Sequence, residues 1–182
     1  MFTYNIDEDL YLRLIDEGDR DAVYKLTDDG RDYLRKWLNW VDGIKNPEDT
    51  MNFIKMAKKS YAENSGLHAG IVFRDEVVGI AGYNKLDQSN HIAHIGYWLG
   101  EGYQGNGIIT KVARALTDYA FNYLKMNKVE IRAASENIKS RAVPERLGYT
   151  EEGTIRAAEN IYGVYVDHVV YGVLKKEWET EL

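Results

Sequence analysis

The stretch YQGNGIITK, residues 103–111, has the composition of an anion-binding turn. Gly105 and Gly107 stand two apart, and the apolar periodicity that follows them predicts a helix. Backbone N–H groups at a helix start, together with the positive end of the helix dipole, bind phosphates. The turn lacks the Gly-Lys-Ser/Thr of a P-loop, and Thr110 stands where a dinucleotide fingerprint has its third glycine. By itself the turn therefore fits a phosphate site and an ordinary strand-to-helix connection equally well.

The other polar residues give no support to metal chemistry. The chain has no cysteine, which excludes a disulfide framework, a thiolate nucleophile and a Cys-type zinc site. His91 and His94 are three apart in a segment that predicts a strand, so their side chains lie on opposite faces and cannot bind one ion together. His168 stands in an apolar alternation beside Asp167, which is more typical of a packed strand histidine than of a catalyst. We therefore expect no metal.

The composition is that of a water-soluble globular protein. With 182 residues, two prolines, no repeat and no low-complexity run, we expect one domain over residues 1–182. The net charge of −6 argues against a nucleic-acid partner and permits a cationic or amine-bearing one. The start of the chain has no signal-peptide pattern, and no segment approaches the ~20 apolar residues of a membrane span. We therefore expect a cytoplasmic protein with no membrane partner.

The elements that must position these residues follow from periodicity. Apolar positions three and four apart predict helices, alternation predicts strands, and Asn46 before Pro47 is a favourable helix start. One predicted hairpin covers 67–86, with its turn at 74–76. The other predicted strands cover 9–16, 91–100, 128–135, 149–159 and 164–174. The predicted helices cover 19–40, 46–66, 105–125 and 140–148, and the first of them has a break near Gly30. An antiparallel block precedes one crossover helix, so we expect an α/β (α+β) fold with a mixed, mostly antiparallel seven-stranded sheet flanked by helices.

This order, with the glycine turn between the fourth strand and the next helix, resembles the GNAT superfamily of acyl-CoA-dependent N-acetyltransferases. The family's turn reads Gln/Arg-x-x-Gly-x-Gly/Ala, and residues 104–109 here read Gln-Gly-Asn-Gly-Ile-Ile, which departs at the last position. The stretches DYLRKWLNWVD (32–42), IRAASENIKSRAVPERLGY (131–149) and YVDHVVYGVL (165–174) resemble the RimJ/RimL branch, which acetylates protein N-termini, among them those of ribosomal proteins. The resemblance covers nearly the whole chain.

The resemblance gives the glycine turn a ligand, the pyrophosphate of acetyl-CoA, which serves as co-substrate. The fourth strand of the family splays from the fifth, so that the pantetheine arm adds as a partial strand and one strand amide faces the thioester oxygen. The implied cofactor-binding residues are Tyr97, Trp98 and Leu99 through their backbone, Gln104, Gly105, Asn106, Gly107, Ile108, Ile109 and Thr110 in the turn, and Asn137 beside the pantetheine.

The chemistry that the resemblance implies is direct attack of a neutral amine on the thioester within a ternary complex. An α-amino group has a reference pKa of ~8 and is largely protonated at neutral pH, so a carboxylate base is useful. The RimL-type pattern puts this base at Glu159, which from its sequence context alone is a solvated turn carboxylate. Asp167 is the alternative base.

The acid that protonates the departing thiolate is where the sequence departs from the wider family pattern. Many GNAT enzymes use the Tyr of the pattern Asn-x-x-Ala-x-x-x-Tyr, and counting from Asn137 this position is Pro144, which has no proton to give. The proline also predicts a helix that starts or kinks near Ser140. The Ser140 hydroxyl is then either the acid or the cap of that helix.

Trp37 and Trp40 are three apart in a predicted helix and share a face, which indicates either core packing or, by the resemblance, a lid over the acceptor site. We favour a protein N-terminus as the acceptor, with a small amine such as a polyamine or an aminoglycoside as the alternative. A protein that keeps the CoA site without catalysis, as an acyl-CoA sensor, is the third hypothesis. The sequence leaves a homo-oligomer open.

Overall fold

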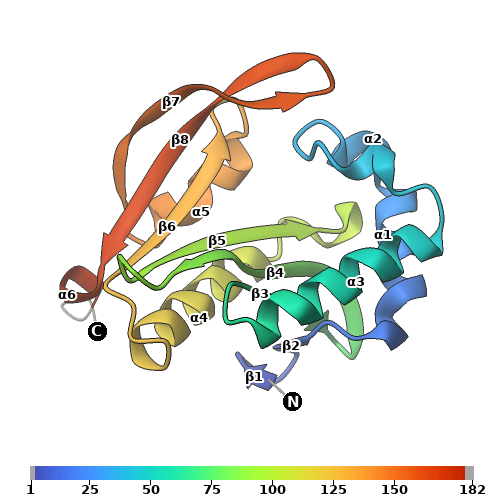
Figure 1. The fold of residues 1–182 in the computed structure, drawn as a ribbon, viewed down its shortest axis with the longest axis horizontal. Helices are drawn as coiled ribbons and strands as arrows, with labels where there is room; N and C mark the ends of the chain where they lie inside the picture. The colour runs from blue at the N-terminus through green and yellow to red at the C-terminus, as the bar shows by residue number, and fades with distance from the viewer. Residues whose placement is uncertain (1–2, 179–182) are drawn as a thin grey trace.

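The computed structural model describes residues 3–178, and one eight-stranded sheet forms its centre (Figure 1). The strands are β1 (Thr3–Asn5), β2 (Leu10–Leu14), β3 (Leu67–Phe73), β4 (Glu76–Asp87), β5 (Ile92–Leu99), β6 (Lys128–Ala134), β7 (Thr150–Ile161) and β8 (Val164–Leu174). Their order across the sheet is β1-β2-β3-β4-β5-β6-β8-β7. Only β5 and β6 are parallel neighbours, and the other pairs are antiparallel. The predicted mixed, mostly antiparallel sheet is confirmed.

The sheet has one strand more than the sequence predicted. The additional strand, β1, has three residues and pairs with β2 through the register Thr3↔Arg13 to Asn5↔Tyr11. A strand this short shows less than two full alternations of side chains, so its periodicity cannot be distinguished from a loop. Its existence depends on the edge that β2 offers.

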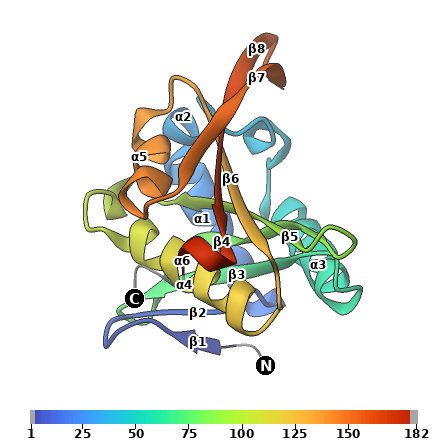
Figure 2. The same ribbon diagram turned by 90° about the vertical axis from the view of Figure 1, so that its left-hand side faces the viewer.

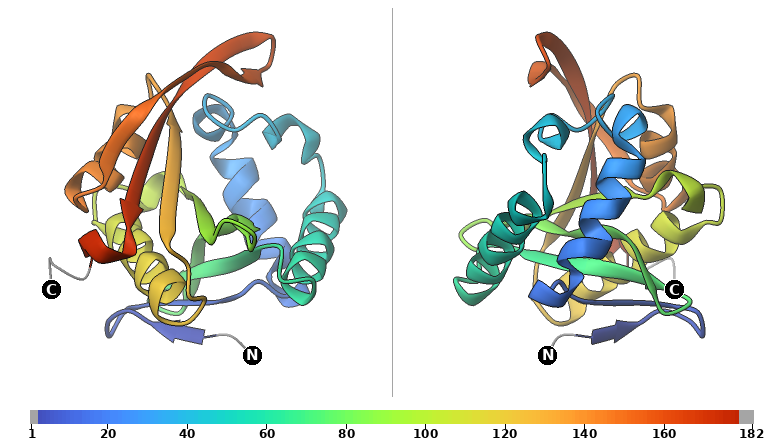
Figure 3. Two further views of the ribbon diagram at one scale, coloured as in Figure 1. Left: turned by 60° about the vertical axis from the view of Figure 1, so that its left-hand side comes forward. Right: turned by 90° about the vertical axis from the view of Figure 1, so that its right-hand side faces the viewer.

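Helices cover both faces of the sheet (Figures 2 and 3). On one face lie α4 (Ile108–Asn122), α5 (Ile138–Arg146) and α6 (Lys175–Trp178), and on the other lie α1 (Arg20–Asp29) and α3 (Pro47–Ala62). The short elements are α2 (Arg31–Leu34), η1 (Glu17–Asp19), η2 (Val41–Gly43) and η3 (Glu101–Tyr103). No helix within residues 3–178 is long and apolar enough to cross a membrane.

Local signals explain most of these elements. The side chain of Asn46 accepts hydrogen bonds from the first-turn amides of α3, and Pro47 occupies its first position, where an N–H would have no helical partner. Arg74 and Asp75 both have positive φ in the two-residue turn between β3 and β4, as a tight hairpin requires. Helix α4 buries Val112 and Leu116 completely against the sheet, each worth roughly 1.5–3 kcal/mol of transfer free energy.

The helix predicted over 19–40 is wrong in its second half. Helix α1 ends at Asp29, near the predicted break, but α2 ends at Leu34 and residues 35–40 form turns. The Arg31 guanidinium donates to the carbonyls of Val41 and Ile44, both at 2.8 Å, and thereby holds the chain in a turn. These bonds join residues ten and thirteen apart, so the periodicity of a local window does not reveal them.

Candidate acetyltransferase site

The parallel strands β5 and β6 separate at their carboxyl ends, and this separation opens the site. Their paired residues run from Ile92↔Lys128 to Ile95↔Ile131 and stop there. Beyond this point β5 continues to Leu99 along β4, while β6 continues to Ala134 along β8 (Figure 1). In the described part of the chain, no strand therefore pairs with the backbone of Tyr97, Trp98 and Leu99 on its β6 side. This edge fits an extended ligand that pairs as a partial strand.

The glycine turn has the geometry of an anion site at the start of α4. Gly105 and Gly107 have φ of +78° and +70°, which side-chain-bearing residues rarely adopt, and a Cβ atom at either position would meet nothing within 4 Å. The Lys111 N–H donates to the Gly107 carbonyl, so the amides of residues 108–110 precede the first helical hydrogen bond. No side chain within residues 3–178 caps this end, whereas Asn46 caps α3 and Asn137 caps α5. The N-terminus of α4 is thus free for a ligand.

Three residues complete the turn. Ile108 is buried in the core, so only its backbone faces the turn. The Asn106 amide donates to the carbonyl of Tyr103 at 3.2 Å and fixes the loop. The Gln104 Oε1 accepts from Lys139, while its buried Nε2 has no well-aligned acceptor among the described residues and interacts with the Tyr33 phenol. A buried donor without a well-aligned acceptor, beside a free helix N-terminus, fits an anionic group such as a pyrophosphate.

A cavity of about 1000 Å³ lies on the β5–β6 separation and extends between α1, α3, the loop after α2 and the hairpin β7–β8. Seven of the predicted site residues line it: Trp37, Trp40, Tyr97, Trp98, Asn137, Ser140 and Glu159. The side chains of neighbouring residues on β5 point to opposite faces of the sheet. Tyr97 packs against the main core on the α4 side. Trp98 packs against a second buried cluster, which includes Val23 of α1 and Ile54 of α3. The cavity thus joins the two faces of the sheet.

Glu159 lies in this cavity beside His168, and their side chains share a hydrogen bond of 2.9 Å between Oε2 and Nε2. A bulge in β7 creates the contact. The register of β7 and β8 shifts between Ile155↔His168 and Glu159↔Val166, so three residues of β7 oppose Asp167 alone. Without the bulge Glu159 would pair with Val164, two residues further from His168.

Asp167, the alternative base, has a different position. Its carboxylate accepts a hydrogen bond of 2.7 Å from the N–H of Ala157, the bulge residue with φ +48°. Asp167 is not among the residues that line the cavity, and His168, which follows it, points the opposite way into the cavity. Its side chain therefore stabilises the bulge that positions Glu159.

Ser140 is not the cap of α5. Helix α5 begins at Ile138, and the side chain of Asn137 accepts from the Ser140 N–H at 3.2 Å. The Ser140 hydroxyl instead lies 3.5 Å from the phenol oxygen of Tyr97, at the edge of the cavity. Burial raises the pKa of Tyr97 to about 12, with the Ser140 hydrogen bond acting in the other direction, so the phenol stays protonated at neutral pH.

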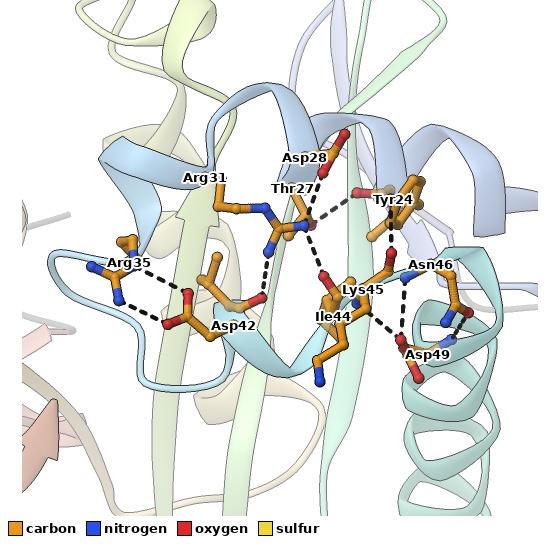
Figure 4. Close-up of polar contacts among 12 residues, drawn as sticks. Tyr24, Thr27, Asp28, Arg31, Arg35, Asp42, Ile44, Lys45, Asn46 and Asp49 are labelled. Atoms are coloured by element: carbon orange, nitrogen blue, oxygen red, sulfur yellow. Dashed lines mark hydrogen bonds and ion pairs between the residues drawn. The ribbon is translucent and has the colours of Figure 1, made fainter. Parts of the chain in front are cut away.

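The loop that follows α2 carries Trp37 and Trp40, and a network of polar contacts fixes it (Figure 4). Arg31 binds two carbonyls of the loop, as described above, and Arg35 forms a two-pronged ion pair with Asp42, with contacts of 3.1 and 2.7 Å. The predicted common helical face of the two tryptophans is therefore wrong, although both line the cavity.

Contacts across the cavity extend this wall. The ring of Trp40 lies 5.8 Å from that of Trp98 on β5. From the tip of the β7–β8 hairpin, the Tyr162 hydroxyl donates to the Leu38 carbonyl at 3.0 Å and accepts from the Asp42 N–H at 3.1 Å. The loop and the hairpin thus meet over the cavity and restrict its entrance.

Sequence reasoning missed two features of the site. It interpreted His168 as a packed histidine, whereas His168 lines the cavity and contacts Glu159. It also overlooked a charged group on β5 and β6, in which Arg132 and His94 contact the buried carboxylate of Glu130. Alternation in β6 could have indicated that Glu130 and Arg132 share a face, but not that this face borders a cavity. Within the described residues, no cluster of three His, Asp or Glu side chains has the arrangement of a metal site.

Comparison with known proteins agrees with this geometry. The family model "Acetyltransferase (GNAT) domain" matches residues 9–150. The putative ribosomal N-acetyltransferase YdaF of Bacillus subtilis (strain 168) is 38% identical over 185 residues. The alignment covers 100% of this chain and 100% of that protein.

Two solved structures with coenzyme A derivatives are similar over most of their length. RimL, a ribosomal L7/L12 α-N-protein acetyltransferase in complex with coenzyme A, has a TM-score of 0.92 and 26% identity over 95% of this chain and 98% of that chain. The microcin C7 self-immunity acetyltransferase MccE, in complex with acetyl-CoA and AMP, has a TM-score of 0.89 and 26% identity over 93% and 94% of the two chains. Together with the β5–β6 separation and the open glycine turn, these matches establish that the chain belongs to the GNAT family of acetyltransferases, which use acetyl-CoA as their acetyl donor.

Proposed function

We propose that this enzyme acetylates the N-terminal α-amino group of a protein, in a ternary complex with acetyl-CoA. The observation that carries the proposal is the Glu159–His168 pair, which lines the cavity on the far side of the sheet from α4. The names of the relatives, a ribosomal N-acetyltransferase and a ribosomal L7/L12 acetyltransferase, support a protein N-terminus as acceptor. We expect the enzyme to act where ribosomal proteins are made, in the cytoplasm.

The protein supplies binding, orientation and proton transfer. When bound, acetyl-CoA supplies an acetyl group activated as a thioester. The free amides at the start of α4 and the buried Gln104 Nε2 would hold its pyrophosphate, and the β5 edge at 97–99 would hold its pantetheine arm. These positions use backbone groups almost entirely, which explains why Ile109 is acceptable where the family has Gly or Ala.

Glu159 would remove the proton from the acceptor amine, which leaves the nitrogen lone pair free to attack. His168 holds one carboxylate oxygen of Glu159 and leaves the other free for the amine or for a bridging water. The Ser140 hydroxyl would pass a proton to the departing thiolate and take the replacement proton from solvent at the cavity edge, since Asn137 and not Ser140 caps α5. The indole rings of Trp37, Trp40 and Trp98 would exclude water from the reacting atoms.

A peptide panel tests the proposal directly. The purified enzyme is incubated with acetyl-CoA and peptides that have a free N-terminus, and the products are identified by mass shift. Matched peptides with a formylated N-terminus and an internal lysine distinguish the α-amino group from the ε-amino group. Acetylation of free N-termini alone is the expected result.

The same assay also tests the two other hypotheses, a small-amine acceptor and an acyl-CoA sensor. Faster turnover of polyamines or aminoglycosides than of any peptide would assign a small-amine acceptor. Calorimetric binding of acetyl-CoA without thiol release in any arm would assign a sensor.

A further inference from the structure

The acceptor cavity has a second charged group besides Glu159, at Arg132 of β6 and Lys85 of β4. We propose that these two cations form a subsite for a carboxylate of the acceptor, namely the side chain of an Asp or Glu at the second or third residue of the acceptor peptide. The proposal rests on the proposed function, since it specifies which N-termini the enzyme prefers.

The register of the sheet places this group on the same face as Glu159 and His168. In β6, Glu130, Arg132 and Ala134 share one face because side chains alternate. Ala134 pairs with His168 of β8. Arg132 pairs with Val170 of β8 and Glu159 pairs with Val166, so the two residues are four positions apart along the strands and two strands apart across the sheet, roughly 16 Å between their backbones. A hydrogen bond of about 3 Å at each end leaves roughly 10 Å, which an extended peptide spans from its α-amino group to the side chain of its second or third residue.

Arg132 is held by a buried carboxylate. Its Nε donates to Glu130 Oε1 at 2.6 Å, and the Glu130 side chain is 7% exposed. Burial raises the pKa of Glu130, but the Arg132 hydrogen bond and the charges of Arg132, His94 and Lys128 outweigh burial, so the pKa lies below its ordinary value. Glu130 therefore stays ionised at neutral pH and orients the guanidinium.

The outer part of the Arg132 guanidinium is free to bind a ligand. Its two terminal nitrogens have no hydrogen-bond partner within residues 3–178, and the side chain is 44% exposed at the cavity wall. A guanidinium whose Nε is occupied still presents its two terminal nitrogens to a carboxylate.

Lys85 adds a second cation. It pairs with His94 across β4 and β5, and His94 pairs with Glu130 across β5 and β6, so the three side chains form one row. Lys85 also lines the cavity, and its nearest carboxylate, that of Asp87, lies 3.8 Å away. The single carboxylate of Glu130 is shared by Arg132, Lys128 and His94.

The cavity is therefore polarised. Its negative end is Glu159, where the amine reacts, and its positive end is Arg132 with Lys85. An acceptor with an N-terminal amine followed closely by a carboxylate complements both ends, whereas a Lys or Arg at the same position would lie against like charge.

The test uses peptides that share one N-terminal residue and carry Asp, Asn or Lys at position two or three. For the wild-type enzyme we expect kcat/KM to be at least ten-fold higher for Asp than for its amide isostere Asn, and lowest for Lys. Arg132→Gln should remove this preference, and Arg132→Glu should reverse it toward Lys, both with the KM for acetyl-CoA retained.

Lys128→Gln is the matched control, because Lys128 also contacts Glu130, at 3.5 Å, but does not line the cavity. It should keep the preference for Asp. Calorimetry of the same peptides with the CoA-bound protein gives a readout that is independent of turnover. Equal binding of the Asp and Asn peptides, or a preference that survives in Arg132→Glu, would overturn the subsite. A preference in binding without acetylation would keep the subsite and refute the proposed function instead.

Discussion

The phenol of Tyr97 donates a hydrogen bond to the backbone carbonyl of Ser140 at a distance of 3.1 Å. That carbonyl is available because Pro144, four residues later in α5, has no N–H to occupy it. The proline that removes the acid of the wider GNAT pattern thus also creates a fixed contact between β5 and α5. This contact lies where the two strands separate, and it places the Ser140 hydroxyl at the cavity.

The contact predicts a coupling between Tyr97 and Pro144. Tyr97→Phe leaves the Ser140 carbonyl without its partner and should lower the free energy of unfolding by about 1 kcal/mol. In a Pro144→Ala background the new alanine N–H can donate to this carbonyl, so Tyr97→Phe should lower the free energy of unfolding by less. Urea denaturation of the four proteins in a double-mutant cycle measures the difference. An equal loss of unfolding free energy in both backgrounds would show that the hydrogen bond from Tyr97 to this carbonyl does not contribute to stability.

Ser140→Ala should lower kcat roughly ten-fold or more, with acetyl-CoA affinity nearly kept, because the hydroxyl acts on the departing thiolate. Since Asn137 is the cap, this variant should melt close to the wild-type temperature. Asn137→Ala should instead weaken acetyl-CoA binding and lose about 1 kcal/mol of stability with the cap. Stopped assays and thermal melts of both variants separate these effects. A Ser140→Ala enzyme with normal kcat would exclude the serine as the acid.

Glu159→Gln should lower kcat more than it raises the KM for acetyl-CoA, because a base acts on the amine and not on cofactor affinity. Activity should recover partly at high pH, where more of the acceptor amine is deprotonated without help. Asp167→Asn is the control, since its amide oxygen can still accept from the Ala157 N–H. It should keep near-normal turnover. The reverse pattern, with Asp167→Asn inactive and Glu159→Gln active, would assign the base to Asp167.

Gly107→Val should weaken acetyl-CoA affinity more than ten-fold, about 1.4 kcal/mol. At φ +70° a β-branched residue is strained, and its side chain would enter the open space above the turn. Gly102→Val is the matched control, because a Cβ atom at Gly102 would also meet nothing within 4 Å, but its φ is not positive. Calorimetry on the folded variants compares them. Unchanged affinity in Gly107→Val would remove the turn from the cofactor site.

Glu130 should contribute stability that depends on pH. A carboxyl whose pKa is lower in the folded than in the unfolded chain stabilises the fold above its unfolded pKa of ~4.3, and this contribution is lost as pH falls further. Melting temperatures of the wild type should therefore fall more steeply between about pH 5 and pH 3 than those of Glu130→Gln. The exposed Glu8→Gln provides the control, and parallel curves for the wild type and Glu130→Gln would contradict the prediction.

Local chemistry explains which parts of the fold the sequence determined. The start of α3 at Asn46 and Pro47, the tight turn at Arg74 and Asp75 and the glycine turn before α4 each depend on residues a few positions apart. Helical and alternating periodicity placed the longer strands and helices for the same reason. The open turn where we propose that the cofactor binds was predictable because the exposure of its backbone amides follows from a glycine pattern.

The tertiary structure alone decided the side of the cavity where we propose that the acceptor binds. The contact of Glu159 with His168 depends on a bulge pinned by Asp167, and the position of Trp37 and Trp40 depends on the bonds of Arg31 to distant carbonyls. The charged row of Lys85, His94 and Glu130 forms only when three strands align in one register. Each of these features requires contacts between residues far apart in the chain, and side-chain type and spacing within a local window do not encode which partner a residue meets.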